Sequence, residues 1–147
     1  MKSLNIASKR IIFQLIENMY EAECLEIENK PYLNLVLERI GNEIKTAYGD
    51  ADMYSLSSCY EQDEHLKIEL LMCFAVIDNR KENSTDWRSV KVFPYMLRQT
   101  DPKIFEVSIQ IRKGYFQHVD RDLQKRHVEF ANQWLHNIKK QGFLDEV

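Results

Sequence analysis

The stretch IELLMCFAVI at residues 68–77 decides the fold, because its apolar residues occupy both alternating sets of positions. Successive side chains of a strand point to opposite faces of a sheet, so this run predicts a central strand that is covered on both sides. A buried helix would show the same pattern. The polar loop NRKENSTD at residues 79–86 follows directly and favours the strand.

The run YLNLVLERI at residues 32–40 places leucines at every second position and predicts a strand. Gly41 and Asn42 then lie at the junction with the next run, NEIKTAY at residues 42–48. A pair that begins with Gly between two such runs is typical of a two-residue hairpin, because Gly tolerates the positive φ of the turn. We therefore expect the first two strands to pair in antiparallel fashion across Gly41.

Three further runs are typical of strands. MYSLSSCY at residues 53–60 alternates, and WRSVKVFPYMLR at residues 87–98 contains Pro94, which must lie at an edge or a bulge because Pro has no N–H to donate. KIFEVSIQIR at residues 103–112 alternates most clearly. One of its two faces is predicted to be buried and consists of Phe105, Val107, Ile109 and Ile111.

Two amphipathic helices flank these strands. Residues 5–23 repeat apolar side chains at steps of three and four, and Ser3 or Asn5 is the predicted N-cap. The second helix covers residues 120–141, with Asp120 as its N-cap.

The end of the second helix contains several residues that a binding site also uses. Gly142 suits the left-handed position after a helix, which predicts that Phe143 packs back on Ile138. Trp134 lies on the apolar stripe of the helix, so we interpret it as a core anchor, with a ligand-stacking role as the alternative.

These elements predict one α+β domain over residues 1–147, with a five- or six-stranded antiparallel sheet and both terminal helices on one face. The second apolar face of the strand at 68–77 then needs a cover. A homodimer would supply this cover, because two-fold dimers are the commonest soluble assemblies. A strongly curled sheet that closes on itself is the alternative.

Composition restricts the classes of protein that fit. The chain has 147 residues and a net charge of −3, and it contains no apolar run long enough for a membrane span, so we expect a cytoplasmic protein. Its three cysteines have no C-x-x-C spacing, and no motif predicts a metal or another cofactor. No catalytic signature is present, so an enzyme would need a site assembled from distant strands.

Charge is distributed unevenly along the chain. Residues 1–79 carry 7 basic and 14 acidic side chains, whereas residues 80–147 carry 13 and 9. A basic half can bind a polyanion. The candidate residues for this role are Lys91, Arg98, Arg112, Arg121, Lys125 and Arg126.

A polar turn supplies a second candidate binding site. Glu61, Asp63 and His65 combine carboxylates with an imidazole in YEQDEHLKIE at residues 60–69, although a solvated turn explains the same residues.

Two segments carry a family pattern. The first is SLSSCYEQDEHLKIELLMCF at residues 55–74, which aligns without a gap to S-L-x-x-Y-Y-E-Q-N-G-D-L-M-x-D-P-E-M-x-F through Ser55, Leu56, Tyr60, Glu61, Gln62, Leu66, Met72 and Phe74. Asp63, Glu64 and His65 replace the N-G-D of the pattern, and Glu69, Leu70 and Leu71 replace its D-P-E. The closing segment fits through Phe130, Trp134, Leu135, Asn137, Ile138, Lys139, Gln141, Gly142 and Phe143, and the residues between them that fit are Pro94, Asp101 and Glu106. The chain thereby resembles a family of small bacterial proteins of unknown function found in plasmids, phages and integrative elements.

The resemblance implies an α+β domain with an accessory role in a mobile genetic element. Our leading hypothesis is a non-enzymatic protein-binding or adaptor domain whose partner is another protein. A nucleic-acid-associated accessory protein that uses the basic half is the alternative. An enzyme with a dispersed site is the third hypothesis.

Overall fold

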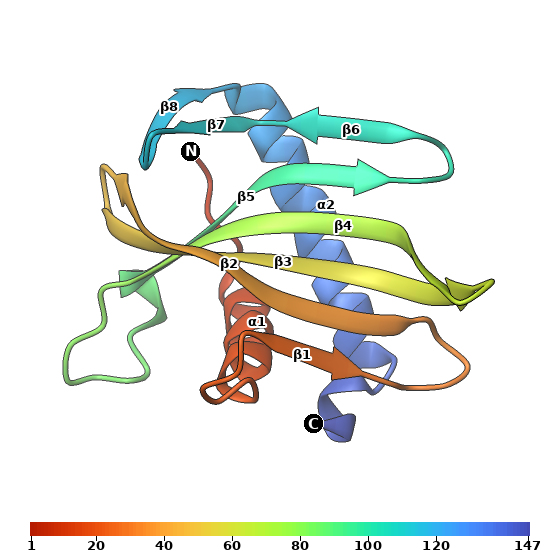
Figure 1. The fold of residues 1–147 in the computed structure, drawn as a ribbon. Helices are drawn as coiled ribbons and strands as arrows, with labels where there is room; N and C mark the ends of the chain where they lie inside the picture. Colours follow the sequence, from red (N-terminus) through yellow and green to blue (C-terminus); the bar gives the residue numbers. More distant parts are fainter.

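The computed structural model describes all residues from Met1 to Val147. Figure 1 shows two helices behind a strongly twisted sheet. The elements in chain order are α1 (Ile6–Glu17), β1 (Cys24–Ile27), β2 (Asn34–Thr46), β3 (Gly49–Gln62), β4 (His65–Asp78), a 3-10 turn (Trp87–Ser89), β5 (Val90–Gln99), β6 (Ile104–Val107), β7 (Ile109–Arg112), β8 (Tyr115–Val119), α2 (Arg121–Lys140) and a second 3-10 turn (Phe143–Glu146).

The sheet has eight strands in the order β6-β5-β4-β3-β2-β8-β7, and β1 also pairs with β2. All pairs are antiparallel except β2 with β8, where Lys45 lies opposite Tyr115. Only Ser108 separates β6 from β7, so one bent segment pairs first with β5 and then with β8 (Figure 1). The sheet thereby closes into a ring at one end. The α+β class is confirmed, but the prediction of five or six antiparallel strands is wrong.

Two apolar cores lie on opposite faces of the sheet. The larger core lies under α1 and α2. The smaller core lies inside the ring and contains Ala75 and Ile77 from β4 with Ile109 from β7. This second face is therefore covered at that end by the chain itself, so the premise of the homodimer argument is wrong there. The homodimer stays a prediction, which light scattering tests.

The hairpin expected at Gly41 and Asn42 is wrong. Residues 34–46 form one long strand, β2, which pairs with β3 over its length with register shifts on both sides of Gly41. Glu43 has a positive φ of 53° beside these shifts. Bulges add residues and increase the local twist of a strand, which explains how β2 bends without reversing direction. The true partner, β3, follows the turn at Thr46–Gly49.

The alternating run at residues 103–112 is also not one strand with one buried face. The chain bends at Ser108, so Ile109 is buried in the ring whereas Phe105 and Val107 are 67% and 38% exposed. The prediction that these two side chains are buried is wrong. Beside this run, Pro94 lies where the pairing of β4 and β5 shifts register, which confirms the bulge.

The predicted capping residues are confirmed, but α1 ends at Glu17, six residues before the predicted end at residue 23. The side chains of Asn5 and Asp120 accept the backbone N–H groups of Ser8 and Leu123 at 2.8 and 3.1 Å. Gly142 takes a left-handed conformation with φ 90°, and its N–H donates to the Lys139 carbonyl at 3.1 Å. Each of these bonds satisfies a backbone group that the helix leaves without a partner.

The N-terminal segment contacts β5 and α2, two elements that are far from it in the sequence. Lys2 donates its backbone N–H to the side-chain oxygen of Gln124 at 2.8 Å and accepts from the amide nitrogen of the same side chain at 2.7 Å. The backbone N–H of Leu4 donates to the Val92 carbonyl at 3.0 Å. Neither helix has the length and apolar character that crossing a membrane requires.

Candidate functional site

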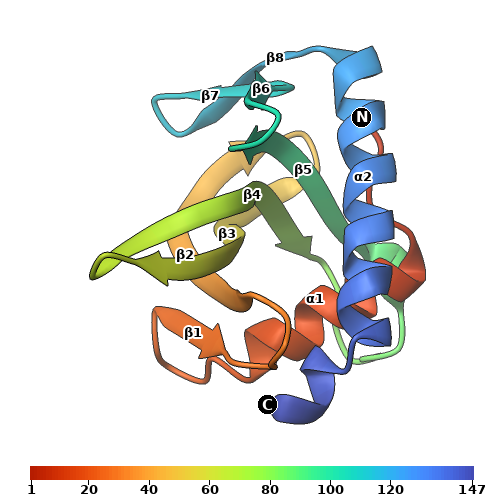
Figure 2. The ribbon, with the colours of Figure 1, turned by 90° about the vertical axis from the view of Figure 1, so that its right-hand side faces the viewer.

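A pocket of about 350 Å³ opens beside the C-terminal half of α2, and we call it the acidic pocket. In Figure 2, α2 stands to the right of the strands, and its C-terminal half is the lower part. This volume lies within the range of small-ligand sites. The lining residues are Tyr32, Leu33, Leu35, Ser58, Glu69, Leu70, Gln99, Asp101, Trp134, Asn137, Ile138, Gln141 and Phe143.

Two local irregularities place carboxylates in the acidic pocket. A register shift between β3 and β4 lies beside Glu69, so Glu69 and its neighbour Leu70 both line the pocket. The β5–β6 turn carries Asp101. Thr100 attaches this turn to β4, because its backbone N–H donates to the Glu69 carbonyl at 3.1 Å. The two carboxylates therefore come from neighbouring segments of backbone.

The walls of the acidic pocket are aromatic and apolar. Trp134 is only half-buried and packs against the helix-side core, so the core-anchor prediction describes part of its surface and the rest faces the pocket. The rings of Tyr32 and Phe143 lie 5.9 Å apart, centroid to centroid. An adjoining depression shares Leu33, Glu69 and Asp101 with the pocket and adds Tyr60 and Thr100.

Helix α2 adds amide groups to the pocket. The side-chain oxygen of Asn137 accepts from Gln133 at 3.0 Å, which leaves its NH₂ group without a protein partner. The carbonyl of Gln141 accepts from Asn29 at 2.9 Å, which holds the helix end against the segment that carries Tyr32. The amide side chain of Gln141 has no protein partner either.

No Lys, Arg or His lines the acidic pocket or the adjoining depression. A cation is attracted to carboxylates by charge and to the faces of Trp and Tyr rings by their quadrupoles. The arrangement therefore suits a cationic group attached to an apolar stem. The chain contains no group of three or more His, Cys, Asp or Glu side chains that could hold a metal ion.

The polar turn predicted as a site is the exposed tip of the β3–β4 hairpin. Asp63 and Glu64 both have positive φ, 54° and 66°, as the two central residues of a type I′ turn require. The register sets His65 opposite Gln62 and Glu61 opposite Leu66. The hairpin brings these polar residues close in space, and none of them lines the acidic pocket or the adjoining depression.

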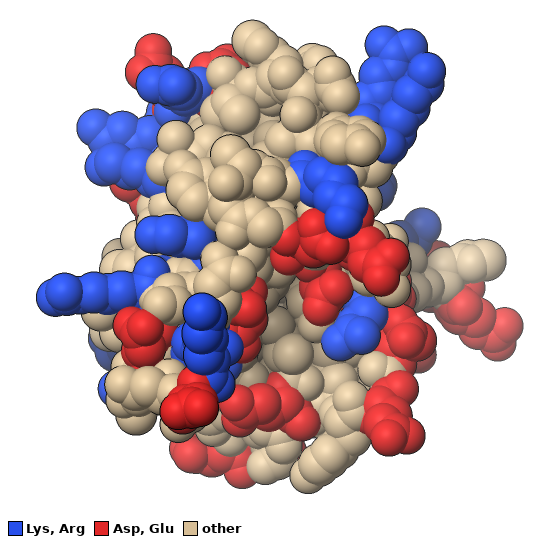
Figure 3. All heavy atoms as spheres, turned by 90° about the vertical axis from the view of Figure 1, so that its left-hand side faces the viewer, with Lys and Arg blue, Asp and Glu red and all other residues tan.

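The basic candidates come from separate elements. Arg98 is on β5, Arg112 is at the end of β7, and Arg121 opens α2, where Lys125 and Arg126 follow one turn later. Arg112 lies opposite Tyr115, at the start of β8, whereas α2 follows the other end of β8 at Val119. These two ends of β8 are four residues, or about 13 Å, apart. On the face in Figure 3, Lys and Arg form separate groups with acidic side chains between them. Nucleic-acid binding stays a prediction.

The fold does assemble a serine, a histidine and a carboxylate from distant segments. The hydroxyl of Ser108 lies 2.8 Å from Nδ1 of His127, and Nε2 of His127 lies 3.2 Å from the Glu106 carboxylate. Because a carboxylate only accepts, Nε2 donates to it and Nδ1 accepts from the serine hydroxyl. Ser108 and His127 are each only 1% exposed, so no substrate reaches the hydroxyl. The trio therefore fixes α2 to the corner between β6 and β7.

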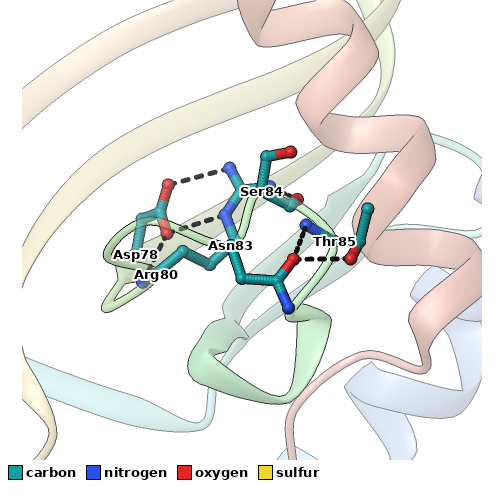
Figure 4. Close-up of polar contacts among 5 residues, drawn as sticks. All are labelled: Asp78, Arg80, Asn83, Ser84 and Thr85. Carbon is teal, nitrogen blue, oxygen red and sulfur yellow. Dashed lines mark hydrogen bonds and ion pairs between the residues drawn. The ribbon is translucent and has the colours of Figure 1, made fainter.

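The loop after β4 contains a second dense polar cluster (Figure 4). The guanidinium of Arg80 donates twice to Asp78, at 3.0 and 2.9 Å, and once to the Ser84 carbonyl at 2.8 Å, and the backbone N–H of Arg80 donates to Asp78 at 3.0 Å. Its guanidinium also stacks on the rings of Phe13 and Trp87, at 4.9 and 4.5 Å. This pairing holds the pKa of Asp78 below its usual value. Phe13 belongs to α1, so Arg80 attaches the loop to this helix.

The sequence indicated some of the pocket residues and missed others. Trp134 and Phe143 were singled out as helix and stop-signal residues. Glu69 and Asp101 were not candidates, because their meeting depends on a β-bulge and on pairing between distant strands. The one local signal was the acid at position 69 inside an otherwise apolar run.

Comparison with known proteins gives a family. No curated protein and no solved structure matches the chain. The profile of a family described as "Domain of unknown function (DUF6908)" matches residues 7–144, which include α2, all eight strands and all of α1 except its first residue. The chain therefore belongs to this family of domains of unknown function.

Proposed function

We propose that the protein is a non-enzymatic binding domain that holds a Lys or Arg side chain of a partner protein in the acidic pocket. The observation that carries the proposal is that Glu69 and Asp101 are the only charged residues that line it. The proposed partner is a protein, because Lys and Arg join a cationic head to an apolar stem. That stem matches the leucine and aromatic walls.

Further support comes from the burial of the pocket floor. Phe143 and Leu35 are each 2% exposed, so the floor is rigid core rather than a mobile loop. The polar groups stand at the rim, where Glu69, Asp101 and Gln141 are exposed. A long side chain could bury its stem on the floor while its head stays at the wetter rim. This is how Lys and Arg are usually accommodated.

The expected affinity for a single side chain is modest. Exposed ion pairs contribute about 0.2–1 kcal/mol each, and an exposed cation–π contact contributes about 0.5–1 kcal/mol. One cationic side chain therefore gives weak binding by itself. The remaining affinity must come from contacts of the partner outside the pocket, as an adaptor function requires.

Titration with short peptides tests the proposal. Blocked hexapeptides with one central Lys, Arg, Leu or Glu are added to ¹⁵N-labelled protein while the Trp134 indole and Asn137 amide signals are followed. The Lys and Arg peptides should shift these signals at lower concentration than the Leu peptide, and the Glu peptide least. Equal shifts with all four peptides would refute a cation site.

Isosteric neutral variants identify the carboxylates responsible. Glu69→Gln together with Asp101→Asn should weaken binding of the Arg peptide about 2- to 30-fold, which corresponds to two exposed ion pairs. Glu61→Gln is the matched control, because Glu61 is an exposed carboxylate on the β3–β4 hairpin outside the pocket. An equal loss of affinity in the control would mean that only the overall charge matters.

The proposal extends to the setting in which the partner is met. Residues through which the sequence resembles proteins of mobile genetic elements, including Asp101, Trp134 and Asn137, line the acidic pocket. We therefore propose an accessory adaptor role in a bacterial mobile element, supported by that resemblance alone. The test is whether genes beside the coding sequence specify a protein that binds the purified domain and loses binding with Glu69→Gln and Asp101→Asn.

A further inference from the structure

The edge strand β6 has unusual exposure for a sheet edge. No strand pairs with its outer side, which lies beyond β5 in Figure 1. Phe105 and Val107 are the two residues of β6 classed as exposed, and both are apolar. An exposed apolar edge is a template for another strand, and proteins usually block such edges with charge.

The backbone of the same two residues faces outward. Ser108, which directly follows β6, donates its backbone N–H to the Tyr95 carbonyl of β5. Two residues earlier, Glu106 lies opposite Leu97 of β5. Antiparallel strands alternate between residues that bond to the partner and residues that bond away from it. Ile104 and Glu106 therefore bond to β5. The N–H and C=O groups of Phe105 and Val107 point to the open edge.

The free edge of β1 lacks these features. The four residues of β1 include Glu26, and Glu23 and Glu28 lie beside the strand on either end. Three carboxylates along one edge repel a neighbouring strand and deter pairing. The edge of β6 is thus a better docking edge for an added strand than the edge of β1.

A charged depression lies beside β6 and indicates what kind of strand would fit. It is lined by Arg98, Gln99, Thr100, Lys103, Ile104 and Phe105 and has a volume of about 330 Å³. Arg98 and Lys103 are exposed, and neither forms an ion pair within the chain. No carboxylate lines this depression, whereas the acidic pocket across the β5–β6 turn holds Asp101. The depression is therefore complementary to a negative side chain.

We propose that β6 binds an extended segment of a partner protein as an added strand, with an acidic side chain of that segment between Arg98 and Lys103. Backbone bonds to Phe105 and Val107 supply the pairing, and apolar side chains of the segment cover these two residues. Strand addition of this kind combines backbone bonds for affinity with side-chain contacts for specificity. This surface is separate from the acidic pocket and does not depend on its ligand.

A displayed library of random twelve-residue peptides tests the proposal. Selection against the intact protein should enrich sequences that alternate apolar residues and contain an Asp or Glu. Peptides without that pattern, or no enrichment over a blank surface, would overturn it. The amides of Phe105 and Val107 should become protected from hydrogen exchange when a synthetic copy of the enriched peptide is added.

Two variants distinguish strand addition from nonspecific peptide binding. Val107→Pro removes an outward N–H but no bond to β5, so the domain stays folded and binding of the enriched peptide should fall at least tenfold. Arg98→Gln with Lys103→Gln should lower the affinity for the acidic peptide but not for its version with Gln in place of the acid. Unchanged binding to Val107→Pro, checked as folded by its far-UV spectrum, would refute strand addition at β6.

Discussion

Replacing Gly142 with Ala tests whether the left-handed stop of α2 determines how the helix end is held. Gly142 has φ 90° and ψ 11°, a conformation that costs an L-residue energy and costs Gly little. A Cβ placed there would meet only Asp145 Oδ2 at 3.9 Å and Asn29 Nδ2 at 4.0 Å, which are ordinary contacts. The penalty is therefore purely conformational, about 1 kcal/mol, and it lowers the melting temperature by about 3 °C for a chain of this size.

Two other glycines serve as controls for this value. Gly114 has φ 82° with nothing within 4 Å of the added Cβ, so its Ala variant should lose a similar amount. Gly41 lies in β2 without a positive φ, and its Cβ would meet Met53 at 3.4 Å, so Ala there should change stability by less than about 0.5 kcal/mol. Urea unfolding midpoints with unchanged slopes measure all three. A loss at Gly41 as large as that at Gly142 would refute the conformational explanation.

Three further predictions follow from burial. Trp134→Ala should cost about 3 kcal/mol in urea unfolding, at the lower end of the range for removing a core aromatic ring, because part of the ring faces the pocket; no loss would mean that the ring lies entirely in the pocket. Desolvation lowers the pKa of His127, against the opposing effect of Glu106, so the unfolded chain binds a proton first as pH falls. Stability should therefore be full above about pH 6.5 and decline below it, and His127→Gln should flatten this decline in melting temperatures measured from pH 7.5 to 5. Burial raises the pKa of the Cys73 thiol to about 11, so iodoacetamide at pH 8 should label exposed Cys24 in the native protein and Cys73 only after unfolding; rapid native labelling of Cys73 would show that β4 opens.

The sequence was sufficient to predict two kinds of feature: helix ends that are set by a capping residue, and a strand marked by a continuous apolar run. Asn5, Asp120 and Gly142 have the predicted roles, because a cap needs only neighbouring residues. The central strand at residues 68–77 was identified because both of its faces are covered, one by the helices and one by the ring. The ring is formed by the curling of the sheet, which was one of the two predicted alternatives for this second cover, the other being a homodimer.

Long-range pairing explains the predictions that failed. A Gly beside Asn42 has the same local chemistry in a hairpin and in a bulged strand, and only the pairing with β3 favours the bulge. Strand β8 was missed although Lys113 and Gly114, with φ of 53° and 82°, form the turn before it. The exposed faces of Phe105 and Val107 depend on the bend at Ser108, which the regular alternation does not reveal.

The bonds between Lys2 and Gln124 have a consequence for how the protein is made. A ribosome adds about 5–20 residues per second, so about 6–24 s separate the synthesis of these two residues. During that interval the first segment cannot reach its place beside β5 and α2, and the apolar side of α1 has no α2 to pack on. Folding must therefore finish after nearly the whole chain has emerged, and a nascent chain stalled before residue 120 would expose the α1 surface to chaperones.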